Sequence, residues 1–372
     1  MNRFVAYHFV KGRMAYNRLV HHRNEYNYRP GDFSQPQTVS CPTNVWDYYP
    51  TVGARRGLLK VTQVGDAGFE RDLDHSVYLN RVSAYANGRD EDYHEVAAAA
   101  PGIRVLPTNG RFDNNAQNGF YYPIDGILAY DAETRRRLGG ERIRIDLASF
   151  LHELSSNNVR ATTWYYFPKG YFEDFINQSN GTQIYYVVDT GGASWRVLQG
   201  DEMELTGIFD GTFRLPPVPQ DGTYELRLGI SLNPLRGMGQ FYFGTDPQRL
   251  APVGLPIDMR QSVEDNPAIP WVGDGDDEQV NIENDKNLRN QGFMKAPNYF
   301  TVTNGAGDTP VRGVRAQPAL RAILTVADMD ADQTYYLRMK SALKKTDTQF
   351  SLDFIEYVPT SVYNGVQPED IW

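Results

Sequence analysis

The sequence contains very little cysteine and histidine. Cys41 is the single cysteine in 372 residues, which excludes an intramolecular disulfide and a metal site built from several thiolates. Six histidines are present, and no two of them lie four positions apart on a predicted helix. His152 begins the stretch HELSS, which lacks the second histidine of a zinc-binding helix. We therefore expect the histidines to be structural.

Long apolar runs are absent as well. No stretch approaches the roughly 18 apolar residues that a membrane-spanning helix needs, so we predict no transmembrane segment in this chain. The first residues, MNRFVAYHFVKGR, lack the charged start, apolar middle and small-residue cleavage site of a secretion signal. Two explanations stay open: the protein is cytosolic, or Met1 is not the natural start of the gene product.

Positive charge is outnumbered by negative charge. The chain has 37 Lys and Arg against 46 Asp and Glu, which gives a net charge of −9. Binding to nucleic acid depends on a positive surface that displaces counterions from the phosphates. We therefore expect no nucleic-acid partner.

The motifs of common enzyme classes are missing too. The sequence has no G-x-S-x-G, no H-E-x-x-H, no Walker loop and no G-x-G-x-x-G after a strand. Its many acidic residues make carboxylate pairs inevitable, but the distance between strands cannot be derived from a sequence. We predict a protein that binds and does not catalyse, and we keep a glycoside hydrolase-like enzyme as an alternative.

Aromatic residues, glycine and proline are plentiful. Aromatics make up 13% of the chain, with 24 Tyr, and they occur with 33 Gly and 22 Pro, which favours short strands and many turns. In TYELRLGI (223–230), apolar residues alternate with Glu225 and Arg227, a pattern typical of a strand with one buried and one solvent-facing side. TYYLRMKSAL (334–343) alternates in the same way. Residues 176–372 therefore predict an all-β sandwich.

The strand QFSLDFIEYVP (349–359) has an irregular pattern. Phe350, Leu352 and Phe354 alternate with polar residues, and then Ile355 and Tyr357 change phase. Such a shift is typical of a bulge or of a strand that is buried on both faces.

Between the two parts, the period becomes helical. DAETRRRL has Asp131 as an N-cap, and DLASFLHEL has Asp146 as an N-cap before an apolar stripe at i, i+3, i+4 and i+7. These patterns predict that residues 132–175 are a short helical linker region. The aromatic run TWYYFPKGYF (163–172) at its end is interpreted as interdomain packing.

Residues 1–131 resemble the second half of a fasciclin domain. The stretches that carry the resemblance are AYHFVKGRMAYNRLV, LLKVT and NGFYYPIDGIL. The matching positions are Tyr7, His8, Gly12, Leu19, Asn118, Gly119, Ile124, Asp125 and Leu128. The opening block of the family is absent, and Tyr122 stands where the family has a histidine. The resemblance implies an α+β fasciclin-like region whose N-terminal part is missing, and it favours the view that Met1 is not the natural start.

The rest of the chain is similar to large fasciclin-containing surface proteins of Bacteroidetes and, in its last strand, to jelly-roll carbohydrate-binding modules. That strand matches the modules through Asp353, Ile355 and Glu356. The resemblance implies an α+β N-terminal region followed by a C-terminal jelly-roll sandwich. It also implies an extracellular or outer-membrane surface location, with a lipid anchor outside this chain. The expected partner is a glycan, or alternatively a surface protein that a structural adhesin would bind.

Exposed aromatic residues beside polar ones are what a glycan site requires, because sugar C–H faces pack on rings while their hydroxyls need hydrogen-bond partners. Trp195 lies beside Arg196 in a Gly-rich loop, and Arg236 lies in another turn. Trp271 precedes the acidic loop, and Tyr299 closes it. These five residues are the predicted ligand-binding residues. The alternative for each tryptophan is a place in the core, which is where tryptophan is mostly buried.

Residues 271–300 predict a long loop over one end of the sandwich. Within it, GDGDDE presents Asp274, Asp276 and Glu278 at alternate positions, with Gly275 permitting a tight turn. Oxygen ligands at this spacing make a Ca²⁺ site a hypothesis, although the twelve-residue EF-hand pattern is absent. A solvated acidic loop is the alternative, and no other cofactor is expected.

Overall fold

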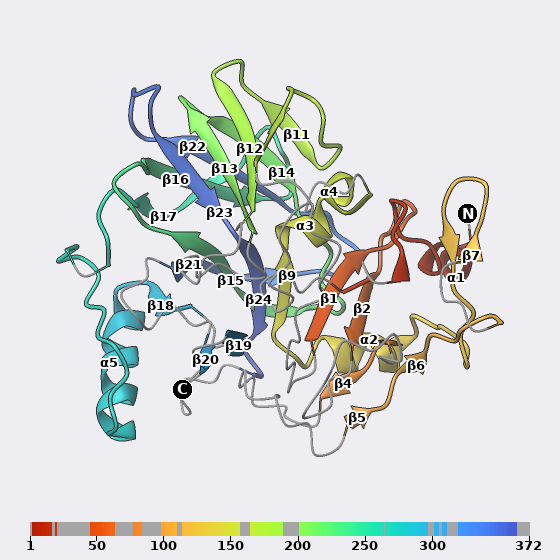
Figure 1. Ribbon diagram of the computed structural model, residues 1–372. Coiled ribbons are helices and arrows are strands. Elements are labelled where there is room, and N and C mark those ends of the chain that lie inside the picture. Colours follow the sequence, from red (N-terminus) through yellow and green to blue (C-terminus); the bar gives the residue numbers. More distant parts are fainter. Residues whose placement is uncertain are drawn as a thin grey trace.

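The computed structural model describes residues 2–16, 19–20, 45–63, 77–83, 98–109, 114–156, 164–188, 201–263, 265–296, 301–304, 307–310 and 319–362. Strands dominate these residues, as Figure 1 shows. In the described part of the chain, no helix is long and apolar enough to cross a membrane.

The N-terminal part combines one short helix with a small antiparallel sheet. Helix α1 (Arg3–Tyr7) precedes a four-stranded sheet. Its strands, in spatial order, are β1 (Val45–Pro50), β2 (Leu58–Gln63), β3 (Val77–Leu79) and β6 (Ile103–Arg104). The strand predicted at LLKVT is confirmed as β2. Two hairpins complete the region: β4 (Val82–Ser83) with β5 (Ala98–Ala100), and β7 (Asn114–Asn115) with β8 (Phe120–Tyr121).

The residues behind the fasciclin resemblance have structural roles in this part. The Asp125 carboxylate accepts the backbone N–H of Arg104 at 2.8 Å, and the Tyr122 hydroxyl donates to the carbonyl oxygen of Met14 at 2.5 Å. Leu128 is buried in the N-terminal core. Assignment to the fasciclin family stays a prediction.

The predicted helical linker contains helices, but it also contains strands. Helix α2 (Ala132–Leu138) begins at Asp131, whose carboxylate accepts the backbone N–H of Thr134, so this N-cap prediction is confirmed. The second predicted helix is divided at Leu151 into α3 (Leu147–Phe150) and α4 (His152–Ser156).

The prediction of a short helical linker region over residues 132–175 is incomplete, because β9 (Ile143–Asp146) and β10 (Trp164–Phe167) lie there too and belong to sheets of the C-terminal part. Both strands have four residues. Runs this short show too little alternation to be distinguished from helix by period alone.

The C-terminal part is built from three larger antiparallel sheets. One has the order β10, β12 (Thr182–Val188), β13 (Asp201–Gly207) and β23 (Gln349–Leu352). A second has the order β11 (Phe175–Gln178), β14 (Asp210–Arg214), β22 (Tyr336–Ser341), β16 (Met238–Gly244) and β17 (Ala251–Asp258). The third, here called the central sheet, has the order β18 (Phe293–Lys295), β21 (Ala319–Met329), β15 (Gly222–Ser231), β24 (Phe354–Pro359) and β9. A hairpin, β19 (Thr301–Asn304) with β20 (Gly307–Pro310), stands apart.

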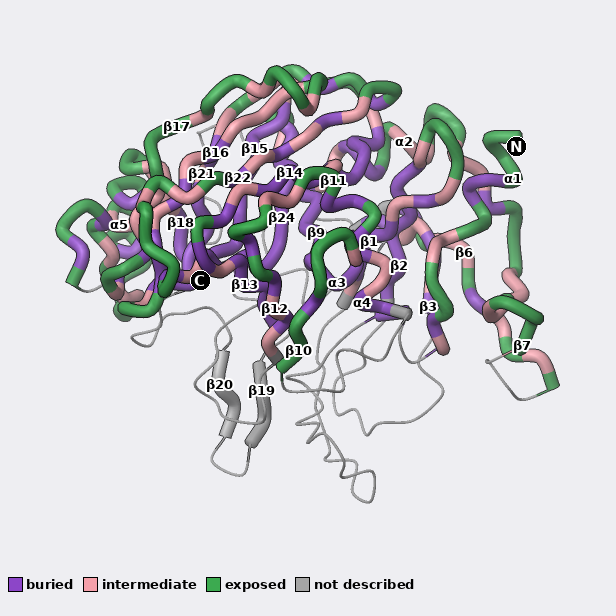
Figure 2. The backbone as a smooth tube through the Cα atoms, turned by 90° about the horizontal axis from the view of Figure 1, so that it is seen from above, coloured by how far each residue is buried: buried purple, intermediate pink, exposed green. Residues whose placement is uncertain are grey.

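One hydrophobic core lies between these sheets. Leu228 of β15, Met339 of β22 and Leu352 of β23 come from three different sheets and meet in the same cluster. This arrangement agrees with the predicted β-sandwich. Figure 2 shows the contrast between buried β24 and β9 and the mostly exposed outer strand β17.

The predicted change of phase near residue 354 is confirmed. The strand is interrupted at Asp353, which separates β23 from β24. Leu352 and Ile355 face the sandwich core, whereas Phe354 packs in the N-terminal core. β24 thus contributes to both cores. Its neighbour β9 in the central sheet also contacts β1 of the N-terminal sheet.

The predicted long loop after Trp271 contains a helix, α5 (Glu278–Asn290), which corrects that expectation. The carboxylate of Asp277 accepts the backbone N–H groups of Gln279 and Val280, and Gly292 follows the helix with a positive φ of 84°. An N-cap and a C-terminal glycine at this spacing are a sequence signal for a helix. The signal was missed because the helix is polar on almost all sides and has no apolar stripe.

The polar side of TYELRLGI faces protein instead of solvent. Glu225 is 4% exposed and Arg227 is 0% exposed, so the prediction of a solvent-facing side on β15 is wrong. Alternation identified the two faces of the strand correctly. It carried no information on what covers the polar one.

That polar side is a network of buried charges around Glu356 of β24, which is 0% exposed. Arg144 of β9 approaches its carboxylate at 2.6 Å, and Arg227 of β15 approaches it at 3.4 Å. Arg321 of β21 lies at 3.7 Å. Burial alone would raise the pKa of Glu356, but these guanidinium groups hold it at about 2.

We expect Glu356→Gln to reduce the free energy of unfolding by about 3–5 kcal/mol, because it leaves several buried guanidinium groups without their counter-charge. Folding depresses this pKa, so the stabilisation from Glu356 is present above pH ~4.5 and is lost as the pH falls towards about 2. Urea unfolding of wild type and variant between neutral and acidic pH measures both effects.

The matched control is Glu133→Gln, which removes an exposed carboxylate paired with Arg136 on α2. Surface ion pairs stabilise little, so this variant is expected to unfold like the wild type at neutral pH. Equal losses in the two variants would contradict the role given to Glu356.

Candidate functional site

Exposed aromatic side chains gather at the edge strand β10. In an antiparallel pair, directly opposite residues share a face, and Tyr166 lies opposite Tyr185 of β12. Trp164, two residues before Tyr166, points to the same side. The other side carries Phe167, which is buried in the sandwich core. Trp164 and Tyr166 are 55% and 48% exposed, so this face is open to solvent.

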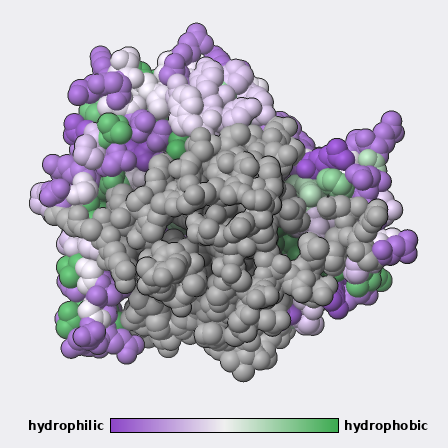
Figure 3. All heavy atoms as spheres, in the orientation of Figure 1, coloured by the Kyte–Doolittle hydropathy of each residue, from purple (hydrophilic) through white to green (hydrophobic). Residues whose placement is uncertain are grey.

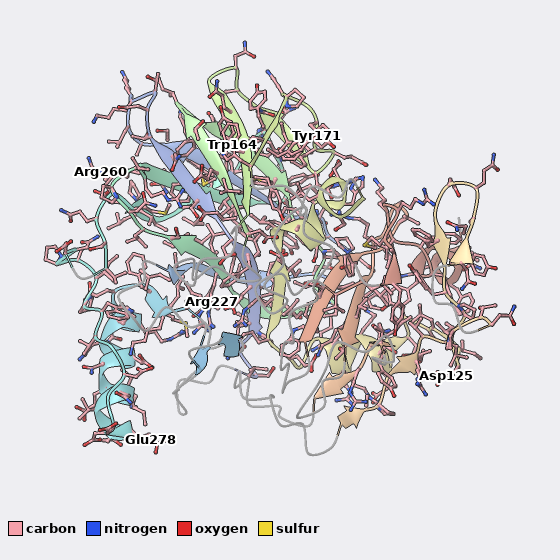
Figure 4. The ribbon with its side chains drawn as sticks, in the orientation of Figure 1. Asp125, Trp164, Tyr171, Arg227, Arg260 and Glu278 are labelled. Atoms are coloured by element: carbon pink, nitrogen blue, oxygen red, sulfur yellow. The ribbon has the colours of Figure 1, made fainter. Side chains whose placement is uncertain are left out.

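The three rings form one continuous cluster, here called the aromatic row: Trp164, Tyr166 and Tyr185. Trp164 stacks on Tyr185 with ring centroids 4.4 Å apart and planes 23° apart, and Tyr166 lies 5.4 Å from Tyr185. Figure 3 shows pale, weakly hydrophilic side chains near the top of the molecule beside strongly hydrophilic ones. Figure 4 places Trp164 in this upper region.

Polar residues continue the same face towards the middle of the sheet. Tyr185 lies opposite Glu204 of β13, and Gln183 lies opposite Thr206. The Tyr185 hydroxyl donates to Oε1 of Gln183 at 3.2 Å. The face therefore combines ring surfaces with carboxylate, amide and hydroxyl groups.

Arg236 lies next to this face, but its side chain is inside the protein, which corrects the expectation of an exposed turn residue. It is 3% exposed. Its Nη2 donates to Oε1 of Glu202 at 2.5 Å and its Nη1 donates to Oε1 of Glu204 at 2.8 Å. Nη2 also donates to the Ser231 hydroxyl at 3.0 Å. Arg236 thus joins two neighbouring carboxylates of β13 and is not available as a direct platform for a sugar.

Two carboxylates share this one guanidinium. Burial and the negative charge of Glu202 raise the pKa of Glu204 to about 7, against the opposing effect of Arg236. A proton on Glu204 leaves one carboxylate for one guanidinium, which balances the buried charge.

The other four predicted ligand-binding residues are not part of this face in the described residues. Trp195, Arg196 and Tyr299 lie outside the described residues. Trp271 is partly buried and packs against the sandwich core, as the alternative interpretation of a tryptophan in the core anticipated.

The acidic residues near Trp271 have partners of other kinds. Asp274 forms an ion pair with Lys295 at 2.5 Å, and Glu278 is in the first turn of α5. Within the described ranges, no group of three or more His, Cys, Asp or Glu side chains, Asp276 included, is placed to hold a metal ion. The ion pair of Asp274 and the place of Glu278 in the first turn of α5 favour the start of a helix over a Ca²⁺ site. Figure 4 shows Glu278 at the outer end of α5, well away from Trp164.

The aromatic row is the feature that the sequence interpretation missed, because TWYYFPKGYF was assigned to interdomain packing. Four consecutive aromatic residues place rings on both faces of a strand. Whether the outer rings are covered depends on the neighbouring strand order, which a sequence does not reveal. The available signal was the position of the run between Thr163 and Pro168, since proline favours an edge strand.

We expect Glu204→Gln to change how stability depends on pH. The folded pKa of Glu204 is above the unfolded value, so folding binds a proton and the wild type loses stability as pH rises from about 4.5 to about 7. The variant should lack this loss, and urea unfolding at about pH 5 and about pH 8 measures it. Glu283→Gln, an exposed change on α5, is the control. Parallel profiles for wild type and Glu204→Gln would refute the assigned pKa.

No protein-family model matches this chain, and no curated protein is similar to it in sequence. Two solved structures of an exo-beta-1,3-galactanase from Phanerochaete chrysosporium, one with beta-1,3-galactotriose and one with galactose, are similar at 10% and 9% identity. In both, 84% of this chain and 68% of the galactanase chain are covered, with TM-scores of 0.23 and 0.22. At these scores the likeness carries no argument, and the candidate site stands on the geometry of the chain itself.

Proposed function

We propose that this protein is a non-enzymatic glycan-binding protein of the cell surface, and that the aromatic row is its contact with the sugar. The observation that carries the proposal is the exposed stack of Trp164 on Tyr185, extended by Tyr166. The C–H face of a pyranose packs on such rings because it is apolar and carries a weak positive potential.

The polar half of the same face supports a sugar over a purely apolar partner. A sugar presents hydroxyl groups at its rim, and these need donors and acceptors close to the rings. Gln183 and Thr206 offer an amide and a hydroxyl beside Tyr185, and Glu204 lies directly opposite it. Gln183 is exposed, so an apolar peptide would displace water from its amide group without replacing the hydrogen bonds to that water, which costs free energy on binding.

The arrangement of the carboxylates supports binding over hydrolysis. A glycosidase needs two carboxyl groups about 5 to 10 Å apart on either side of the scissile bond. Glu202 and Glu204 instead hydrogen-bond to one guanidinium, that of Arg236, and are 2% and 8% exposed. A sugar on the aromatic row would lie beside this cluster and not between its two acids.

The surface location is part of the proposal and rests on the fasciclin resemblance of residues 1–131.

A protein that adheres to a polysaccharide needs a rigid platform, and a ring cluster on a sheet is more rigid than one on a loop. The sandwich supplies this platform through buried Phe167 and Tyr186, which alternate with the exposed rings on β10 and β12.

We expect Trp164→Ala and Tyr166→Ala each to weaken polysaccharide binding about 5- to 10-fold, because each removes a stacking surface that contributes about 1–1.5 kcal/mol. Affinity electrophoresis of the full chain against a panel of plant and host polysaccharides measures the change. The melting temperature should stay close to that of the wild type, because both side chains are largely exposed.

Leu255→Ala on β17 is the control, since Leu255 is 84% exposed and belongs to a different sheet. It should bind like the wild type. Failure of the wild type to bind any polysaccharide, combined with capture of a protein through the same rings, would replace the glycan by a protein partner. Hydrolysis of a bound polysaccharide would contradict the non-enzymatic proposal.

A further inference from the structure

A cleft separates the N-terminal part from the start of the sandwich. One wall is formed by the residues around Lys11 and by the segment from Pro50 to Gly53 after β1. The opposite wall is formed by α3, α4 and the segment before β11. The cleft has a cavity volume of about 130 Å³ and opens to solvent. This volume is roughly ten times what a single water molecule needs, so a small molecule fits.

Ser149 of α3 lines this cleft and is 2% exposed. Among the described residues, its hydroxyl has no hydrogen-bond partner. Leaving a buried hydroxyl unpaired costs about 1–3 kcal/mol. Ser155 of α4 shows the usual arrangement, because its hydroxyl is also buried but donates to the carbonyl oxygen of Ala148 at 2.6 Å. The Ser149 hydroxyl is therefore placed to bond to a group that enters the cleft.

The charged residues of the cleft leave one positive charge in excess. Arg56 donates to Asp174 at 3.0 Å and also to the carbonyl oxygen of Leu215. Arg214 forms ion pairs with Asp174 and, at 3.7 Å, with Glu173. Lys11 forms an ion pair with Glu173 across the cleft. Among the residues that line the cleft, three cations thus face two carboxylates, and Glu153 of α4, behind the lining, accepts the backbone N–H of Glu173 at 2.7 Å.

We infer that this cleft binds a small hydroxylated carboxylate, of the chemical class of a uronic acid. The ligand carboxylate balances the excess charge beside Arg56 and Arg214, whose guanidinium groups each carry five N–H donors. The ligand hydroxyls donate to the acceptors Glu173 and Asp174, and one of them pairs with the Ser149 hydroxyl. Neutral sugars lack the charge, and simple carboxylates such as acetate lack the hydroxyls.

This cleft is separate from the aromatic row and does not depend on the proposed function. Its walls come from both parts of the chain, and Arg56 of the N-terminal part already pairs with Asp174 of the C-terminal part. A bound ligand adds contacts to both walls. Binding to the folded state alone then raises the melting temperature, and above the dissociation constant the rise grows with the logarithm of ligand concentration.

The experiment is calorimetric titration of the full chain with sodium glucuronate and sodium galacturonate, with glucose and sodium acetate as the neutral and the hydroxyl-free probes. We expect at least one uronate to bind more tightly than both glucose and acetate. Ser149→Ala should weaken that binding about 5- to 10-fold, equivalent to one lost hydrogen bond. The melting temperature of the ligand-free variant should equal or exceed that of the wild type, because no hydrogen bond is lost.

Ser155→Ala is the matched control, and it should lower the melting temperature while leaving uronate affinity unchanged. Titrations in the Trp164→Ala background remove sugar binding at the aromatic row from the comparison, which separates the two sites. The inference is overturned if neither uronate binds, if glucose or acetate binds as tightly, or if Ser149→Ala binds like the wild type. A lower melting temperature in ligand-free Ser149→Ala also overturns it, because that hydroxyl would then have a partner in the free protein.

Discussion

Strand β24 and its central carboxylate, Glu356, connect the parts of this molecule. Ile355 and Tyr357 point into the sandwich core, Phe354 points into the N-terminal core, and Glu356 holds arginines from β9, β15 and β21. Because the charges are buried, each needs its partner, and the register of the central sheet is fixed by these pairings as well as by apolar packing. Both faces of this sheet are buried around β24, whereas β10 lies at the edge of its own sheet and exposes Trp164 and Tyr166.

The sequence predicts much of this fold, and the failures have a common physical cause. Alternation located β15, β22 and the change of phase at Asp353, because a side-chain period of two follows from strand geometry. It could not reveal that Glu225 and Arg227 are buried, since their partners Arg289 and Glu356 are distant in sequence. It also missed α5, a helix that presents polar groups on nearly every side.

The candidate site was harder to predict than the fold. Arg236 and Trp271 were predicted as ligand-binding residues because arginine and tryptophan are common in sugar sites. Arg236 is buried, and Trp271 is partly buried against the sandwich core. The exposed rings of Trp164 and Tyr166 occur in a run that also contains buried Phe167, so hydrophobicity does not separate them. Their exposure results from the position of β10 at the edge of its sheet, which long-range pairing decides.

The central claim is that sugar rings lie on the aromatic row. Saturation-transfer NMR of the intact protein with a soluble oligosaccharide tests it directly, because magnetisation passes only between protons in close contact. We predict that selective saturation of protein aromatic protons is transferred most strongly to the C–H protons on one face of the sugar. Equal transfer to both faces, stronger transfer from methyl protons than from aromatic protons, or no transfer with any oligosaccharide would contradict it.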